Sequence, residues 1–137
     1  MARRLILIVD DDPVMRNSLA RYLAKRGFDV KTVGDGFEVL LLLEYLHPDL
    51  IITDIRMPKL DGLTLLQGLK NREPTSKIPV IFMSGCSTDE ILQKAKELGA
   101  LFFLFKPFPL NYLDEVIEEI LGQECEEYVI SCQGRTV

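Results

Sequence analysis

The feature that most constrains the fold is a regular alternation between short apolar runs and longer amphipathic segments. Four short runs rich in Leu, Ile, Val and Phe, and a fifth run with three β-branched residues, are each followed by a stretch in which apolar residues recur at helical spacing. The runs are residues 5–9, 29–33, 50–53, 79–83 and 101–105. Nearly all-apolar strands occur in parallel sheets that helices cover on both faces. The sequence therefore predicts an α/β fold with five parallel strands and five helices.

Local signals mark where the helices begin and end. Asp12 and Pro13 suit the N-cap and first position of the first helix, and Gly27 suits its end. Ser87 and Glu90 have the spacing of a capping box for the fourth helix. The other predicted helices are residues 37–46, 63–70 and 109–121.

The residues directly after the strands carry the chemistry, because ligands of such sheets bind outside the carboxyl ends of the strands. Asp10 and Asp11 follow the first strand, Asp54 the third, Ser84 the fourth and Lys106 the fifth. Each of these residues is common at strand ends for ordinary structural reasons. Together, the carboxylates repel one another and predict a hard cation such as Mg²⁺. The ammonium and hydroxyl beside them suit a phosphoryl group.

Three segments resemble the receiver domain of two-component response regulators, over roughly residues 4–121. The segments are 6–12, 49–62, and 99–100 followed by 105–108. The most diagnostic motif is Asp-x-x-Met-Pro-x-x-Asp-Gly, which begins at Asp54, directly after a predicted strand. The resemblance implies a flavodoxin-like (βα)5 doubly wound sheet with strand order 2-1-3-4-5.

The resemblance also implies a role for each strand-end residue. Asp54 matches the phosphoacceptor, Asp11 the direct Mg²⁺ ligand, and Asp10 the acid that holds metal-bound water. Ser84 and Lys106 match the hydroxyl and the lysine that contact the phosphoryl group.

Three further positions match the family. Arg56 stands where a backbone carbonyl ligates the metal, and a cis peptide is expected at Lys106–Pro107. Phe103 matches the aromatic residue that turns inward on activation, where many relatives have Tyr or His. A phenylalanine can bury its ring there but cannot donate a hydroxyl hydrogen bond.

The implied function is that of a phosphoacceptor domain rather than an enzyme. A sensor histidine kinase or phosphotransfer protein would supply the phosphoryl group to Asp54. The signal would leave through the surface of the fourth helix, fifth strand and fifth helix, toward a downstream protein or an output domain. We expect residues 1–121 to form the receiver, with residues 122–137 as a tail or the start of a linker. Whether the chain stands alone or belongs to a longer protein stays open.

Charge and hydropathy exclude several other classes. The 21 acidic and 16 basic residues give a net charge of −5, which disfavours direct binding to nucleic acid. No apolar run approaches the ~20 residues that span a bilayer, so no membrane association is expected. Three scattered cysteines suit a reducing, cytoplasmic location.

Surface patterns bear on self-association. The predicted helix 109–121 lacks Lys and Arg, and Leu101 and Phe102 stand where dimerising relatives have acids, so we expect no salt-bridged dimer. Phe37, Leu41 and Tyr45 recur every fourth residue on the outer side of the second helix. We favour partial burial of this stripe by the neighbouring helix; the alternative is an exposed partner surface, so a weak homodimer stays open.

Two other classes of function also stay open. A phosphatase with a nucleophilic Asp54 would want a second aspartate two residues later, where Arg56 stands. A nucleotide-binding module would want a glycine-rich loop after the first strand. Asp10 and Asp11 repel phosphate there unless a metal intervenes.

Overall fold

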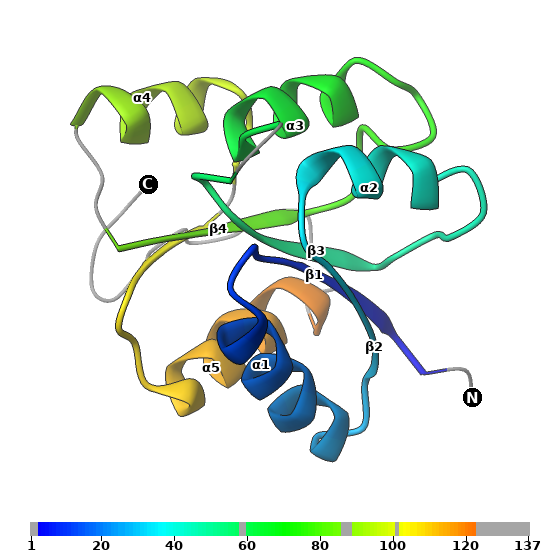
Figure 1. Ribbon diagram of the computed structural model, residues 1–137, viewed down its shortest axis with the longest axis vertical. Helices are drawn as coiled ribbons and strands as arrows, with labels where there is room; N and C mark the ends of the chain where they lie inside the picture. The colour runs from blue at the N-terminus through cyan, green and yellow to red at the C-terminus, as the bar shows by residue number, and fades with distance from the viewer. Residues whose placement is uncertain (1–2, 58–59, 86–88, 101, 123–137) are drawn as a thin grey trace.

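The computed structural model describes residues 3–57, 60–85, 89–100 and 102–122, which form one five-stranded sheet and five helices (Figure 1). All strand pairs are parallel, in the order β2-β1-β3-β4-β5. This arrangement confirms the predicted fold. In chain order the elements are β1 (Leu5–Val9), α1 (Pro13–Lys25), β2 (Asp29–Val33), α2 (Gly36–Leu42), β3 (Leu50–Asp54), α3 (Gly62–Lys70), β4 (Val80–Ser84), α4 (Asp89–Glu97), β5 (Phe102–Phe105) and α5 (Leu110–Leu121).

The helices cover the sheet in two layers. Helices α1 and α5 lie on one face, and α2, α3 and α4 lie on the other (Figure 1). The strands β1, β3 and β4 are therefore buried on both sides, which explains why their sequences are almost wholly apolar. Because the strands are parallel, the carboxyl ends of β1, β3, β4 and β5 lie along one edge of the sheet, where the predicted site residues stand.

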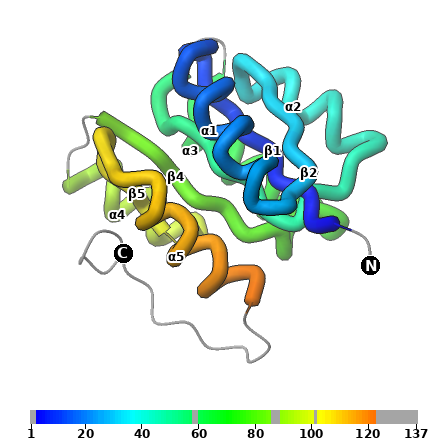
Figure 2. Tube along the Cα trace, turned by 90° about the horizontal axis from the view of Figure 1, so that it is seen from below, coloured from blue at the N-terminus to red at the C-terminus, as the bar shows by residue number. Residues whose placement is uncertain are grey.

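Helices α1 and α5 lie side by side (Figure 2), and side-chain contacts join them. The Tyr22 hydroxyl donates to the Asp114 carboxylate, and the Arg26 guanidinium pairs with the same carboxylate at 2.7 Å. At the far end of α5, Nη1 of Arg4 donates to the carbonyl oxygen of Leu121 at 2.8 Å. This last bond joins residues that are 117 positions apart in the sequence.

The second helix is shorter than predicted. Asp35 caps it by accepting a hydrogen bond from the Glu38 amide at 2.9 Å, and the helix ends at Leu42 rather than at residue 46. The amide of Tyr45 then bonds the carbonyl of Leu42 at 2.9 Å, so the chain continues in tight turns. Apolar spacing alone does not distinguish such turns from another turn of helix.

The predicted partial burial of the stripe formed by Phe37 and Leu41 on α2 and by Tyr45 in the turns after it is wrong. Phe37 is 56% exposed, Leu41 57% and Tyr45 77%. Val39, on the opposite side of the same helix, is fully buried, and α2 also contacts α3. The second helix thus presents an outer surface with two apolar side chains that are more than half exposed.

Smaller differences concern element ends. The fourth strand begins at Val80 and runs to Ser84, and the last helix begins at Leu110, with Pro109 in the N-cap position. Ser87 of the predicted capping box and Leu101 of the predicted fifth strand lie outside the described residues, as does the tail after Gly122. Among the described residues, no helix is long and apolar enough to cross a membrane.

Candidate functional site

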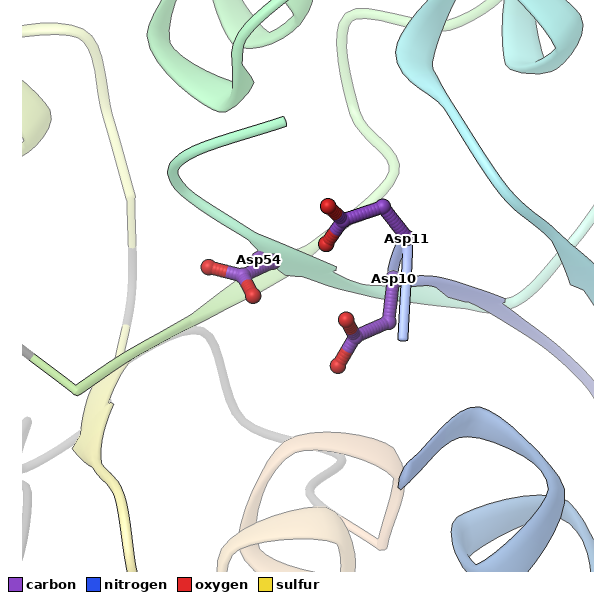
Figure 3. Close-up of side chains that lie close together, drawn as sticks. All are labelled: Asp10, Asp11 and Asp54. Atoms are coloured by element: carbon purple, nitrogen blue, oxygen red, sulfur yellow. The ribbon is translucent and has the colours of Figure 1, made fainter. Parts of the chain in front are cut away.

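Three carboxylates meet at the carboxyl edge of the sheet. Asp10 and Asp11 follow β1, and Asp54 is the last residue of β3, whose register pairs Val9 with Thr53. One oxygen from each carboxylate can be chosen so that all three atoms lie within 4.8 Å of one another. Figure 3 shows the three side chains around a common space. The sequence prediction that these acids converge is thereby confirmed.

Lys106 ties two of these carboxylates together. Its Nζ atom lies 2.9 Å from Oδ2 of Asp54 and 3.1 Å from Oδ2 of Asp10. The Lys106 amide donates to the Ser84 carbonyl at 2.8 Å, which fixes the chain directly after β5 against the end of β4. The peptide bond from Lys106 to Pro107 is cis.

Asp10 is the buried member of the cluster, with no exposed surface. Burial raises the pKa of its carboxyl group, because the charged form loses its hydration. Hydrogen bonds from the Asp12 amide and from Lys106 partly offset this rise. Asp10 therefore holds its proton more tightly in the folded protein than in the unfolded chain.

The same surroundings favour the charged form of Lys106, whereas they favour the neutral form of Asp10. Burial alone would lower the pKa of its ammonium, but the hydrogen bonds to Asp54 and Asp10 outweigh burial, and the net pKa is raised. Lys106 is thus a permanent cation at neutral pH.

Gly62 lets the next helix begin directly against the strand that carries Asp54. A Cβ atom on this residue would lie 2.7 Å from the carbonyl oxygen of Asp54 and 2.9 Å from Cα of Ile55. The Gly62 amide donates to the Ile55 carbonyl at 2.8 Å, and Asp61 caps α3 by accepting from the Thr64 amide. Any larger residue would push the loop after Asp54 away from the helix.

The other predicted site residues lie nearby but in different settings. Ser84 is buried at the end of β4, and the Arg56 side chain is exposed. The Arg56 amide lies 3.3 Å from Oδ1 of Asp54. Phe103 is fully buried, with its ring centroid 6.1 Å from that of Phe82 and 5.2 Å from that of Phe105.

The donor set fits a hard divalent cation. Three carboxylates face one ammonium, so the cluster keeps a negative charge even with Lys106 in place. Asp11 is exposed, and within the described part of the chain its carboxylate makes no hydrogen bond or ion pair. Carboxylate oxygens with room for water beside them suit Mg²⁺.

Sequence reasoning missed the contacts that hold the acids in place. The Arg16 guanidinium donates to the carbonyl oxygen of Asp10 at 2.9 Å, and the Asp12 amide donates to its carboxylate at 3.0 Å. Backbone donors and acceptors leave no residue signature in the sequence. Asp12 was predicted only as a helix cap. It does cap α1, and its amide also holds the Asp10 carboxylate.

The model of the family described as the response regulator receiver domain matches residues 6–118. The chain belongs to this family. The match includes the three carboxylates and all five strands except Leu5, and it confirms the resemblance found in the sequence. Residues 6–118 are therefore a receiver domain of the two-component type.

Relatives and solved structures agree with this assignment. The transcriptional regulator NtrC of Salmonella typhimurium is 37% identical over 127 residues, which are 93% of this chain and 27% of NtrC. PdtaR of Mycobacterium tuberculosis is 32% identical over 116 residues, 84% of this chain and 55% of PdtaR. The receiver thus spans about a quarter to a half of these curated relatives.

Two structural neighbours share the fold closely. A response regulator receiver protein from Pseudomonas putida is 35% identical, with a TM-score of 0.82 over 86% of this chain and 98% of its own. The receiver domain of a Pseudomonas aeruginosa sensor histidine kinase is 26% identical, with a TM-score of 0.81 over 89% of this chain and 100% of its own. The latter has a magnesium ion coordinated in its active-site cleft.

Proposed function

We propose that this receiver accepts a phosphoryl group on Asp54 in a Mg²⁺-dependent reaction. The observation that carries the proposal is the contact of Lys106 with Asp54 at 2.9 Å inside a cluster of three carboxylates. Asp11, Asp54 and the backbone carbonyl of Arg56 would supply oxygen ligands, and Asp10 would hold water bound to the metal. When bound, Mg²⁺ supplies positive charge that offsets the repulsion between the carboxylates and the incoming phosphoryl group.

Asp54, Lys106 and Ser84 have separate roles in the transfer. A carboxylate oxygen of Asp54 attacks the phosphorus atom, a new oxygen–phosphorus bond forms, and the bond to the donor's histidine nitrogen breaks. Lys106 supplies a fixed positive charge to the new phosphoryl oxygens, as the Ser84 hydroxyl supplies a hydrogen bond. The donor is a sensor histidine kinase or a phosphotransfer protein.

The response involves Ser84 and Phe103. The phosphoryl oxygen draws Ser84 inward, Phe103 fills the vacated space, and the surface of α4, β5 and α5 changes toward a downstream protein or output domain. Such a switch requires two states with different contacts. Phe103 is already fully buried against Phe82 and Phe105, which limits how far its ring turns. A crystal structure with an active-state phosphate mimic would defeat the switch if Ser84 and Phe103 kept their rotamers.

Residues 1–121 act as the receiver, residues 122–137 as a tail or the start of a linker, and the protein works in the cytoplasm. It acts as a phosphoacceptor that catalyses only its own phosphorylation and dephosphorylation.

Labelling with a small-molecule phosphodonor tests the proposed acceptor. Incubation with the donor and Mg²⁺, followed by intact-mass measurement, should show one labile added phosphoryl group. The addition should need Mg²⁺ and disappear in Asp54→Asn. Asp61→Asn is the matched control, because it removes a nearby carboxylate while Asn still caps α3. Labelling of Asp54→Asn at the wild-type level would defeat the assignment.

A further inference from the structure

Arg16 reaches from α1 back to the acidic end of β1. Its Nη1 atom donates to the carbonyl oxygen of Asp10 at 2.9 Å, and the side chain is half-buried. The same nitrogen lies 3.6 Å from where a Cβ on Gly34 would stand. The guanidinium therefore lies between the turn after β2 and the end of β1, beside the carboxylate cluster and outside it.

Asp10 is held at each of its four polar positions. Its amide donates to the Val33 carbonyl at 3.2 Å, and its two carboxylate oxygens accept from the Asp12 amide and from Lys106. Arg16 completes the set by binding the carbonyl oxygen. This carbonyl belongs to the peptide group that joins Asp10 to the next residue.

The next residue, Asp11, shows no such support among the residues that the structure describes. Its side chain is exposed, and within the described residues no hydrogen bond or ion pair holds its carboxylate. Because the peptide group is planar and rigid, a carbonyl held by Arg16 also fixes the direction of the Asp11 amide. The position of the Asp11 carboxylate thus depends on how firmly the preceding peptide is held.

We propose that Arg16 is a positioning residue for the cation site: by holding the peptide between Asp10 and Asp11, it keeps the Asp11 carboxylate directed at the space shared with Asp54. The role rests on the proposed Mg²⁺-dependent function. Groups behind the direct ligands of a metal commonly set its affinity in this way. A guanidinium suits the task because it stays charged and its planar donors are fixed in direction.

Calorimetric titration of the whole 137-residue chain with MgCl₂ tests the role. Arg16→Met should weaken Mg²⁺ binding about tenfold, as loss of a second-layer contact typically does. Arg21→Met is the matched control, because Arg21 is exposed on the same helix and its loss changes the net charge equally. Its affinity should stay within about twofold of wild type, as screening of an exposed distant charge predicts. Arg16→Lys, which keeps the charge but not the fork of donors, should fall between wild type and Arg16→Met.

The outcomes separate the alternatives. Wild-type affinity in Arg16→Met overturns the proposal, as does equal weakening in Arg21→Met, which would point to long-range charge. A lower melting temperature of metal-free Arg16→Met with unchanged Mg²⁺ affinity would show a merely structural role. If Arg16→Met does not fold, Arg16→Lys decides, and wild-type affinity in it overturns the proposal. Absence of Mg²⁺ binding by the wild type would defeat the proposed function as well as this role.

Discussion

The Nζ atom of Lys106 lies 2.9 Å from Oδ2 of Asp54, although the two residues are 52 positions apart in the sequence. The contact forms because β3 and β5 flank β4 in a parallel sheet and so end along the same edge. The same ammonium reaches Asp10 at 3.1 Å. One cation is therefore shared between two carboxylates that would otherwise repel each other.

A double-mutant cycle should measure this sharing. Lys106→Met, Asp54→Asn and the double variant are compared by the free energy of unfolding without Mg²⁺. We expect a coupling energy of about 1–3 kcal/mol, as for other contacting residues within one polar network. Lys106→Met alone should destabilise the protein, because it leaves Asp10 and Asp54 without their common partner. A coupling near zero would show that the contact contributes nothing to stability.

Asp54→Asn should stabilise the metal-free protein, since it removes one of three clustered negative charges with little change in shape. It should also reduce the rise in melting temperature that Mg²⁺ gives, because that rise follows from binding to the folded state. Thermal melting with and without millimolar Mg²⁺ measures both effects. The alternative is that Lys106 already neutralises the pocket. This alternative would be favoured if Asp54→Asn lowered the melting temperature and if Mg²⁺ did not change the melting temperature of the wild type.

Asp10 should make stability depend on pH in a specific direction. Burial raises its folded pKa above the ordinary value of 3.8, so the folded state binds the proton more tightly than the unfolded chain does. The free energy of unfolding should then fall as pH rises through 3.8, and the loss should be complete above the folded pKa.

Asp10→Asn isolates this contribution, because the amide does not titrate. In the absence of Mg²⁺, the stability of the variant relative to wild type should increase as pH rises from about 3 to 7. Denaturant unfolding at several pH values measures the difference. A difference between the two proteins that stays constant over this range would contradict the raised pKa.

The apolar stripe on α2 predicts a surface effect. Leu41→Glu should leave the melting temperature nearly unchanged, since Leu41 is more than half exposed, and should weaken any self-association or docking through this face. Leu66→Glu on α3 is the contrasting control, because Leu66 is fully buried and a charge there should cost several kcal/mol. Melting curves and sedimentation give the two readouts. A large drop in the melting temperature of Leu41→Glu would show that the stripe is covered.

The fold class and the convergence of the acids could be predicted from the sequence, because both follow from local patterns. Apolar runs such as residues 5–9 identify the strands. Asp10 and Asp54 come at the ends of such runs, and the carboxyl ends of parallel strands lie at the same edge of the sheet. The order of the strands came from the family resemblance, since periodicity says nothing about which strands are neighbours. The burial of Phe37 and Leu41 was predicted wrongly because an apolar side chain does not reveal what covers it. Arg16 was missed because its acceptor is a backbone carbonyl, which every residue has.

The hydrogen bond from Arg4 to the Leu121 carbonyl shows that the start of β1 lies close to the end of α5. A domain whose two ends meet in this way can be spliced into another polypeptide at one place without being pulled apart. It also tolerates new ends elsewhere. A permuted chain that joins residue 122 to residue 4 through a short bridge, and opens in the polar loop between α3 and β4, should refold and keep its cluster of carboxylates.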